Sequence, residues 1–372
     1  MSQEGAVGEP RCVKLALLAD PDLPQEIAQR LAAELPNLLR RFVAADVTWD
    51  VTTFVTAVVG DEQVDVAELV QVTDRVAPSD DWRLVIVLTD LPRRDGTRPV
   101  AAEVSVDDRV GMVSLPALGS IRLYRRARET IIAVARVLVG TADRLVAQEQ
   151  AARERAVLPR RRGARIRIEP DERGGIRYVT RGFGGRLRLL AGMVRANRPW
   201  RLFTGLSRAL AGVFAAAVLA VVNDVVWDLA TALGSLRLIL LTIISLAALV
   251  AWLIIDHGLW EHGHARSARE RAVLYNASTV ATLFIGVLCL YVVLYVVLGC
   301  TVAFLLPQDV VAEAIGREPS WGDYAALTWF TTSLAMLGGA LGAGLEDEAA
   351  VRRAAYGQRQ RERQLDGSRE NS

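Results

Sequence analysis

Five charged residues follow two strand-like runs of the sequence. The runs KLALLAD (14–20) and RLVIVLTDLP (83–92) are almost entirely apolar until each reaches an aspartate. Because ligands of open α/β sheets bind outside the carboxyl ends of the strands, these residues predict one crevice that can hold a cation or a polar ligand. The alternative is that aspartate and proline only end the strands and cap helices. The candidate ligand-binding residues are Asp20, Asp90, Arg93, Arg94 and Asp95.

All three histidines of the chain lie in DHGLWEHGH (256–264). His257, Glu261 and His264 are spaced so that they would share one face of a continuing helix, where they can hold a divalent metal. Gly258 and Gly263 weaken such a helix, and the alternative is that these histidines meet lipid headgroups. No other cofactor is expected, because no glycine-rich dinucleotide turn follows a strand.

Strand and helix patterns alternate through residues 1–157. Alternation of this kind predicts an α/β domain with parallel strand pairing. The start MSQEGAVGEPRCVK has no apolar core or cleavage site, so we expect no secretory signal. The expected strands are 14–20, 47–59, 83–92 and two shorter ones within 98–118, and the expected helices are 24–42, 65–77 and 121–157.

The stretch VLTDLPRRDGTRPVAAEVSVDDRVGMVSLPALG (87–119) and the helix after it resemble the archaemetzincins and the wider zincin family. In that family an H-E-x-x-H helix follows a short sheet. The resemblance places TIIAVARVLVG (130–140) at the active-site helix, with Ala133 and Val137 at the histidine positions and Val134 at the general base. None of these side chains can bind zinc or move a proton, so the resemblance implies a degenerate, non-catalytic zincin-like domain.

Long apolar segments fill residues 202–346. A membrane span needs about 20 mostly apolar residues to cross about 30 Å of hydrocarbon. The sequence therefore predicts a four-helix transmembrane domain, with no ionisable residue in the central parts of the spans, which disfavours coupled transport. The expected spans are about 203–224, 236–255, 278–306 and 326–345.

The last of these segments contains GGALGAG, with Gly338, Gly342 and Gly344. Small residues at this spacing let two helices approach closely. We expect them to pack helices together, either within the bundle or between copies in a homo-oligomer.

Arginine collects in alternate flanks of the four segments. Bases crowd before the first segment, between the second and third, and in the tail 347–372, whereas the connections 223–235 and 307–324 are acidic. Because arginine stays on the cytoplasmic side, this alternation predicts a multi-pass plasma (inner) membrane protein with both termini cytoplasmic. The charged tail is expected to be disordered at its end.

Residues 158–201 form a basic juxtamembrane segment interrupted by the hairpin ARIRIEPDERGGIRYVT (164–180). Attraction to anionic lipid headgroups is worth about 1 kcal/mol for each base near the surface. We prefer lipid over nucleic acid, because no aromatic side chains alternate with the bases to stack on nucleotides.

The whole chain resembles multi-pass membrane proteins of actinobacteria, in stretches such as LYNASTV (274–280), GALGAGLEDE (339–348) and RRAAYG (352–357). The favoured hypothesis is an integral membrane protein whose cytoplasmic domain is a non-catalytic binding or scaffold module for a cytoplasmic protein or small ligand. One alternative is a membrane-tethered hydrolase or transferase that uses an Asp20/Asp90 crevice. Another is a transporter or channel subunit.

Overall fold

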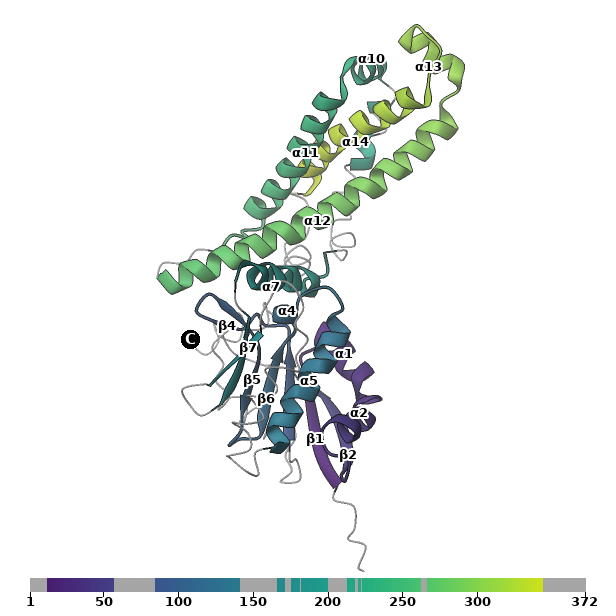
Figure 1. Ribbon diagram of the computed structural model, residues 1–372. Coiled ribbons are helices and arrows are strands. Elements are labelled where there is room, and N and C mark those ends of the chain that lie inside the picture. The colour runs from purple at the N-terminus through teal and green to yellow at the C-terminus, as the bar shows by residue number, and fades with distance from the viewer. Residues whose placement is uncertain are drawn as a thin grey trace, which may run out of the picture. The chain divides into compact units, whose positions relative to one another are not determined.

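The computed structural model divides the chain into two compact units, of which unit 1 ends at Ala196 and unit 2 begins at Asn197 (Figure 1). Unit 1 contains an α/β sheet and unit 2 is helical, as the sequence predicts for the two halves of the chain. The residues that the structure describes are 12–56, 84–140, 166–170, 175–180, 182–199, 213–217, 220–221, 223–261 and 266–343.

Parallel strands form one half of the sheet in unit 1. The pairs β1–β2, β1–β3 and β3–β6 are all parallel, which agrees with the predicted α/β class. Strands β1 and β3 are nearly continuous apolar runs, because both faces of a parallel sheet are covered. The bounds are β1 (Cys12–Ala19), β2 (Thr48–Val55), β3 (Leu84–Thr89) and β6 (Val110–Ser114).

The other half of the sheet is antiparallel and includes the hairpin that we placed in a separate juxtamembrane segment. Strand β8 of that hairpin pairs with β5, so the hairpin extends the sheet of unit 1 rather than standing apart from it. The sheet order is β2-β1-β3-β6-β5-β8-β7, with β4 paired to β5. The bounds are β4 (Arg94–Asp95), β5 (Arg98–Ser105), β7 (Ile166–Pro170) and β8 (Ile176–Thr180).

Helices α1, α2 and α5 contact one another and the parallel strands, which places them on one face of the sheet (Figure 1). The close approach of α5 depends on Gly111 of β6, because a Cβ there would lie 2.3 Å from Cγ1 of Val134. The predicted helix 24–42 is divided in two at Ala33 and Glu34, and proline again occupies the first turn of the second piece. The bounds are α1 (Leu23–Ala32), α2 (Leu35–Phe42), α4 (Leu115–Leu118), α5 (Leu123–Gly140) and α7 (Phe183–Ala196).

Some sequence predictions fall on residues outside the described part of the chain. These are the helix 65–77, the second half of the helix 121–157, most of the segment 203–224, and the tail 347–372.

Unit 2 contains two helices in its described part that are long and apolar enough to cross a membrane, Ser235–Asp256 and Ala272–Leu305. They indicate association with a membrane, and the predicted arrangement of four spans is not confirmed. The segment 326–345 forms a helix as far as Ala343. The bounds are α10 (Asp224–Ala232), α11 (Ser235–Asp256), α12 (Arg266–Leu305), α13 (Gln308–Ile315) and α14 (Trp321–Ala343).

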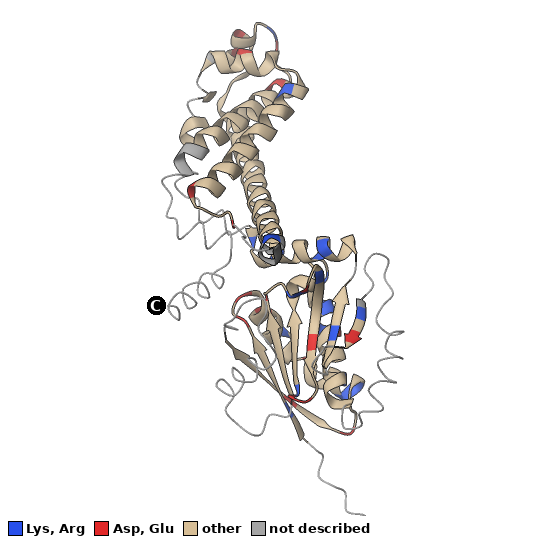
Figure 2. Ribbon diagram, turned by 90° about the vertical axis from the view of Figure 1, so that its left-hand side faces the viewer, with Lys and Arg blue, Asp and Glu red and all other residues tan. Residues whose placement is uncertain are grey.

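Helices α11 and α12 expose large apolar side chains along their outer faces. A soluble monomer rarely leaves a continuous apolar patch of more than a few hundred Å² in water. The middle of the long helices also contains no charged residue, as Figure 2 shows. Examples of the exposed side chains are Leu236, Ile243 and Ile255 on α11, and Phe284, Val292 and Phe304 on α12.

Gly338 lies at a close approach between α14 and the segment 213–217. A Cβ at Gly338 would lie 2.9 Å from the Cβ of Ala216, so the missing side chain allows this contact within unit 2. Gly342 belongs to α14, and Gly344 lies outside the described residues.

Candidate functional site

The carboxyl ends of β1, β3 and β6 carry a row of three buried polar side chains, Asp20, Thr89 and Ser114. Thr89 and Ser114 are register partners in the parallel pair β3–β6. The hydroxyl of Thr89 donates to Oδ2 of Asp20 at 2.7 Å, and Asp20 is completely buried. A buried carboxylate is tolerated only when it is hydrogen-bonded, and this row provides that bonding.

This row holds the loop that leaves β3. The backbone N–H of Asp90 donates to Oδ2 of Asp20 at 3.3 Å, and that of Leu91 donates to Oγ1 of Thr89 at 3.0 Å. The hydroxyl of Ser114 donates to the carbonyl oxygen of Leu91 at 2.6 Å. Residues at the ends of three strands therefore fix the backbone of the loop that begins at Asp90 and leads into β4.

Arg93 leaves this loop and forms a buried ion pair with Glu103 of β5, with Nη2 at 2.6 Å from Oε2. The second carboxylate oxygen, Oε1, lies 3.3 Å from Nε of Arg177 on β8. Glu103 and Arg177 are direct partners in the antiparallel register, so their side chains lie on the same face of the sheet. The pair joins the loop to the antiparallel half of the sheet.

The structure brings together some of the predicted residues and separates others. Asp20 and Asp90 meet at the ends of neighbouring parallel strands, but Asp20 faces the protein interior rather than solvent. The guanidinium of Arg93 is directed to Glu103. Arg94 and Asp95 form β4, where Asp95 is exposed and Arg94 is half-buried. Asp20 and Arg93 therefore hold the loop after β3 in place, and Asp95 is the exposed member of the five.

Sequence reasoning missed Thr89, Ser114 and Glu103. Glu103 is the one carboxylate in the strand RPVAAEVS, whose other central residues are apolar and buried. A lone carboxylate in such a strand needs a basic partner, and this signal was present in the sequence. Thr89 and Ser114 carried no comparable signal, because their role depends on the pairing of β3 with β6.

The helix that resembles the zincin active-site helix is α5. Its Val134 is completely buried against Gly111 in the sheet, while Ala133 and Val137 are half-buried. Val134 thus serves as a packing residue of unit 1. The resemblance to the zincin family stays a prediction.

Of the three predicted metal ligands, the two that the structure describes, His257 and Glu261, both lie outside a helix. Helix α11 ends at Asp256, and His257 lies in the following turn with Nδ1 at 3.7 Å from a carboxylate oxygen of Asp256. The backbone of Glu261 pairs with the side chain of Asn276. His264 lies outside the described residues, among which no group of three possible ligands could hold a metal ion.

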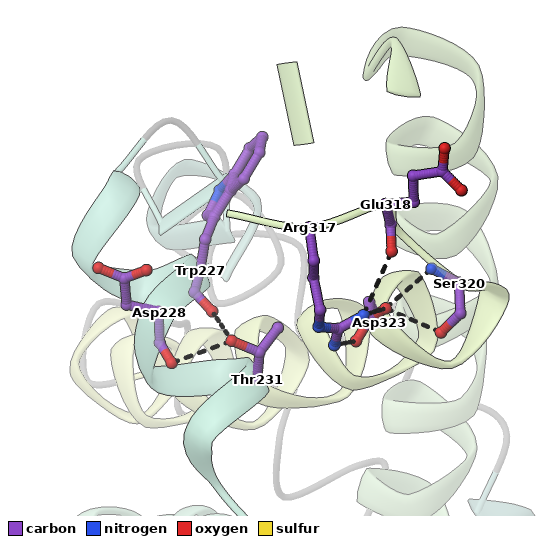
Figure 3. A network of polar contacts seen from close by, with 7 residues as sticks. All are labelled: Trp227, Asp228, Thr231, Arg317, Glu318, Ser320 and Asp323. Atoms are coloured by element: carbon purple, nitrogen blue, oxygen red, sulfur yellow. Dashed lines mark hydrogen bonds and ion pairs between the residues drawn. The ribbon is translucent and has the colours of Figure 1, made fainter. Parts of the chain in front are cut away.

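A second polar network caps the N-terminus of α14, as Figure 3 shows. Arg317 donates to both carboxylate oxygens of Asp323, at 2.8 and 2.5 Å. Asp323 also accepts from the backbone N–H of Ser320 at 2.8 Å, in the manner of a capping box. The hydrogen bonds from Arg317, together with those from Ser320, hold the pKa of Asp323 well below its ordinary value although burial opposes the shift.

This lowered pKa predicts that acid weakens the α14 cap. Because the folded-state pKa lies below the unfolded value of about 4, the stabilisation is complete at neutral pH and decreases progressively as the pH falls below about 5. Hydrogen exchange at the first turn of α14, measured in detergent across this range, should accelerate with acid. The Asp323→Asn variant should show a flatter pH dependence, and an identical dependence in both proteins would contradict the assignment.

Three helices of unit 2 meet at a cluster of hydroxyl groups around Thr242 of α11. Its Oγ1 accepts from Nε1 of Trp329 at 2.7 Å and lies 3.3 Å from the hydroxyl of Tyr291 and 3.1 Å from that of Ser333. The hydroxyls of Tyr291 and Ser333 are themselves 3.0 Å apart. This cluster links α11 and α12 to α14 by polar contacts inside an apolar bundle.

Replacing Thr242 with valine should destabilise the helical bundle by about 1–2 kcal/mol, because Trp329, Tyr291 and Ser333 lose their common partner. Titration with sodium dodecyl sulfate, followed by helical circular dichroism, measures this change. Thr301→Val is the matched control, because Thr301 is exposed on α12 and its hydroxyl bonds the carbonyl oxygen of Val297 in the same helix. Equal effects of the two substitutions would show that the cluster does not join the helices.

Comparison of the chain with protein-family models, curated proteins and solved structures gives no match.

Proposed function

We propose that the chain is an integral membrane protein whose α/β unit faces the cytoplasm and serves as a non-catalytic binding or scaffold module. The observation that carries this proposal is the apolar outer surface of α11 and α12. Both helices are long enough to span, and their windows of highest hydropathy are only 33% and 39% buried. Apolar area left unburied by protein is stable when lipid covers it.

The distribution of arginine supports a four-span topology with both termini in the cytoplasm. The connection between α12 and α14 is acidic and contains Arg317 as its one base, and that guanidinium is paired with Asp323. The start of α12 is basic. The apolar part of α12 would be about 50 Å long at 1.5 Å per residue, so in this topology the helix tilts or projects from the bilayer.

The position of the loop after β3, at the carboxyl ends of the parallel strands, supports the binding role. The order β2-β1-β3 changes direction at β1, so Asp20 and Asp90 flank the point between β1 and β3 where open α/β sheets bind ligands. Because Asp20 is buried and already accepts hydrogen bonds, it holds the loop instead of acting on a substrate. In this proposal Asp90, Arg94 and Asp95 contact a polar ligand or a protein partner.

Two measurements on the full chain test the two halves of this proposal. After an alkaline carbonate wash of cell membranes, the protein should stay in the membrane pellet, whereas a peripheral protein is released. A photo-crosslinking amino acid in place of Asp95 should give a discrete adduct under light in native cells, and Asp90→Ala should remove it.

Asp107 provides the control for the crosslinking experiment. It is also an exposed aspartate, but it lies in the turn at the opposite end of β5. A crosslinker at position 107 should give no corresponding adduct. Equal adducts from both positions, or none from position 95, would contradict binding at this edge of the sheet.

A further inference from the structure

The outer face of α7 is apolar although its inner face already packs against unit 1. On the inner face, Gly192 lies so close to α4 that a Cβ would be 2.1 Å from the carbonyl oxygen of Pro116. Leu189 and Met193 are buried on the same side. On the outer side, Phe183 and Leu187, one helical turn apart, remain 75% and 50% exposed. The exposed pair is therefore not needed for the core of unit 1.

The turn before α5 adds a third exposed apolar side chain to this surface. Ile121 is 71% exposed. It lies two residues from Gly119, where a Cβ would be only 2.4 Å from Cγ of Arg188 on α7. The turn and α7 are thus adjacent, and each carries exposed apolar side chains.

Four arginines accompany these side chains, and among the described residues no carboxylate forms an ion pair with any of them. Arg126 donates to the carbonyl oxygen of Leu118. Burial lowers the pKa of Arg188, and the positive charge of Arg126 lowers it further. An anion beside these guanidinium groups would offset their repulsion. The four residues are Arg122, Arg126, Arg186 and Arg188.

Exposed apolar side chains beside arginines are typical of a helix that lies in the interface of an anionic membrane. Arginine can extend its stem over apolar surface while its guanidinium contacts lipid phosphate. Helix α7 also ends at Ala196, only a few residues before the predicted membrane domain begins. Charge, apolar exposure and position in the chain agree on the same occupant.

We infer that α7 and the turn 119–122 form a docking surface for anionic lipid headgroups, which Arg122, Arg186 and Arg188 bind while Phe183, Leu187 and Ile121 enter the edge of the acyl region. This inference rests on the proposed membrane attachment. It adds that unit 1 binds the bilayer directly, through a defined face of its own.

Hydrogen exchange of the full chain in lipid nanodiscs tests this surface. Discs of phosphatidylcholine alone are compared with discs that also contain phosphatidylglycerol. In the anionic discs, exchange in peptides 119–128 and 182–191 should slow by roughly tenfold, while exchange in β1 and β3 stays unchanged. Arg186→Gln with Arg188→Gln should remove the dependence on phosphatidylglycerol. Phe183→Ser with Leu187→Ser should reduce protection in both kinds of disc.

The control is Arg40→Gln with Arg41→Gln, which makes the same change in net charge on exposed residues of α2. This variant should keep the dependence on phosphatidylglycerol. The inference is overturned if wild-type exchange is equal in both discs. That result would mean that another part of the protein covers this surface, or that the surface stays in water. It is also overturned if the control loses the effect, or if inorganic phosphate added to phosphatidylcholine discs reproduces it. Failure of the chain to enter discs would instead contradict the proposed membrane attachment.

Discussion

Replacing Gly192 with alanine should destabilise unit 1 by roughly 3 kcal/mol, even though alanine is the better helix former. The added Cβ would meet the carbonyl oxygen of Pro116 at 2.1 Å and its Cα at 2.6 Å, and these backbone atoms cannot rotate away as a side chain would. Helix α7 must therefore shift off α4, which costs more than the roughly 1 kcal/mol that alanine gains in helix propensity.

Gly184→Ala is the control for this prediction, because Gly184 is exposed on the same helix. Its substitution should change stability by less than about 0.5 kcal/mol. Native-state hydrogen exchange at the amides of β5 and β6 reports on unit 1 within the full chain. If Gly192→Ala exchanges as slowly as the wild type, the packing of α7 on α4 is not as described.

Replacing Glu103 with glutamine should cost about 3 kcal/mol, because it takes the negative charge away from two basic neighbours in a buried position. The side chains of Glu103 and Arg93 are only 11% and 9% exposed, so water does little to compensate. The loss should extend to the loop after β3, since Arg93 belongs to that loop. Hydrogen exchange at residues 90–95 should therefore accelerate together with exchange at β5.

Glu169→Gln makes the same chemical change in the same cross-strand row, where Glu169 lies opposite Arg177. Glu169 pairs with Arg98, whose side chain is 45% exposed, at 3.3 Å, so its loss should cost no more than about 1 kcal/mol. If the two substitutions have equal and small effects, Glu103 does not hold the loop and is available to a ligand.

The parallel half of unit 1 could be predicted from local patterns, because each pattern of apolar residues lies within one short, consecutive stretch of sequence. The apolar runs of β1 and β3 and the aspartates that follow them could be recognised without knowing their neighbours. The addition of the hairpin strands β7 and β8 could not, since their partner β5 lies about 70 residues earlier in the chain, as the pairing of Glu103 with Arg177 shows. Pairing across such a separation is decided by which sheet edge is free, and no short window of sequence contains that information.

The candidate site shows the same division. Asp20 and Asp90 were identified from their places at strand ends, and the structure does bring them together. Their different roles depend on Thr89 and Ser114. The hydroxyl of Thr89 bonds the buried carboxylate of Asp20, and both hydroxyls bond the backbone of Leu91, which follows Asp90. The metal site was predicted on the assumption that one helix continues past residue 257. Helix α11 instead ends at Asp256, where the turn through Gly258 begins.

The native cysteines allow the most direct measurement of membrane placement. Cys12 is exposed on β1, while Cys289 and Cys300 are exposed on the apolar part of α12. A membrane-impermeant maleimide should modify none of them in intact cells and should modify Cys12 once the cells are permeabilised. Cys289 and Cys300 should stay unmodified until detergent unfolds the chain, because a thiol in lipid does not form the reactive thiolate. Glu318→Cys, in the connection before α14, should react in intact cells. Modification of Cys12 in intact cells, or of Cys289 and Cys300 in native membranes, would contradict a membrane protein with a cytoplasmic α/β unit.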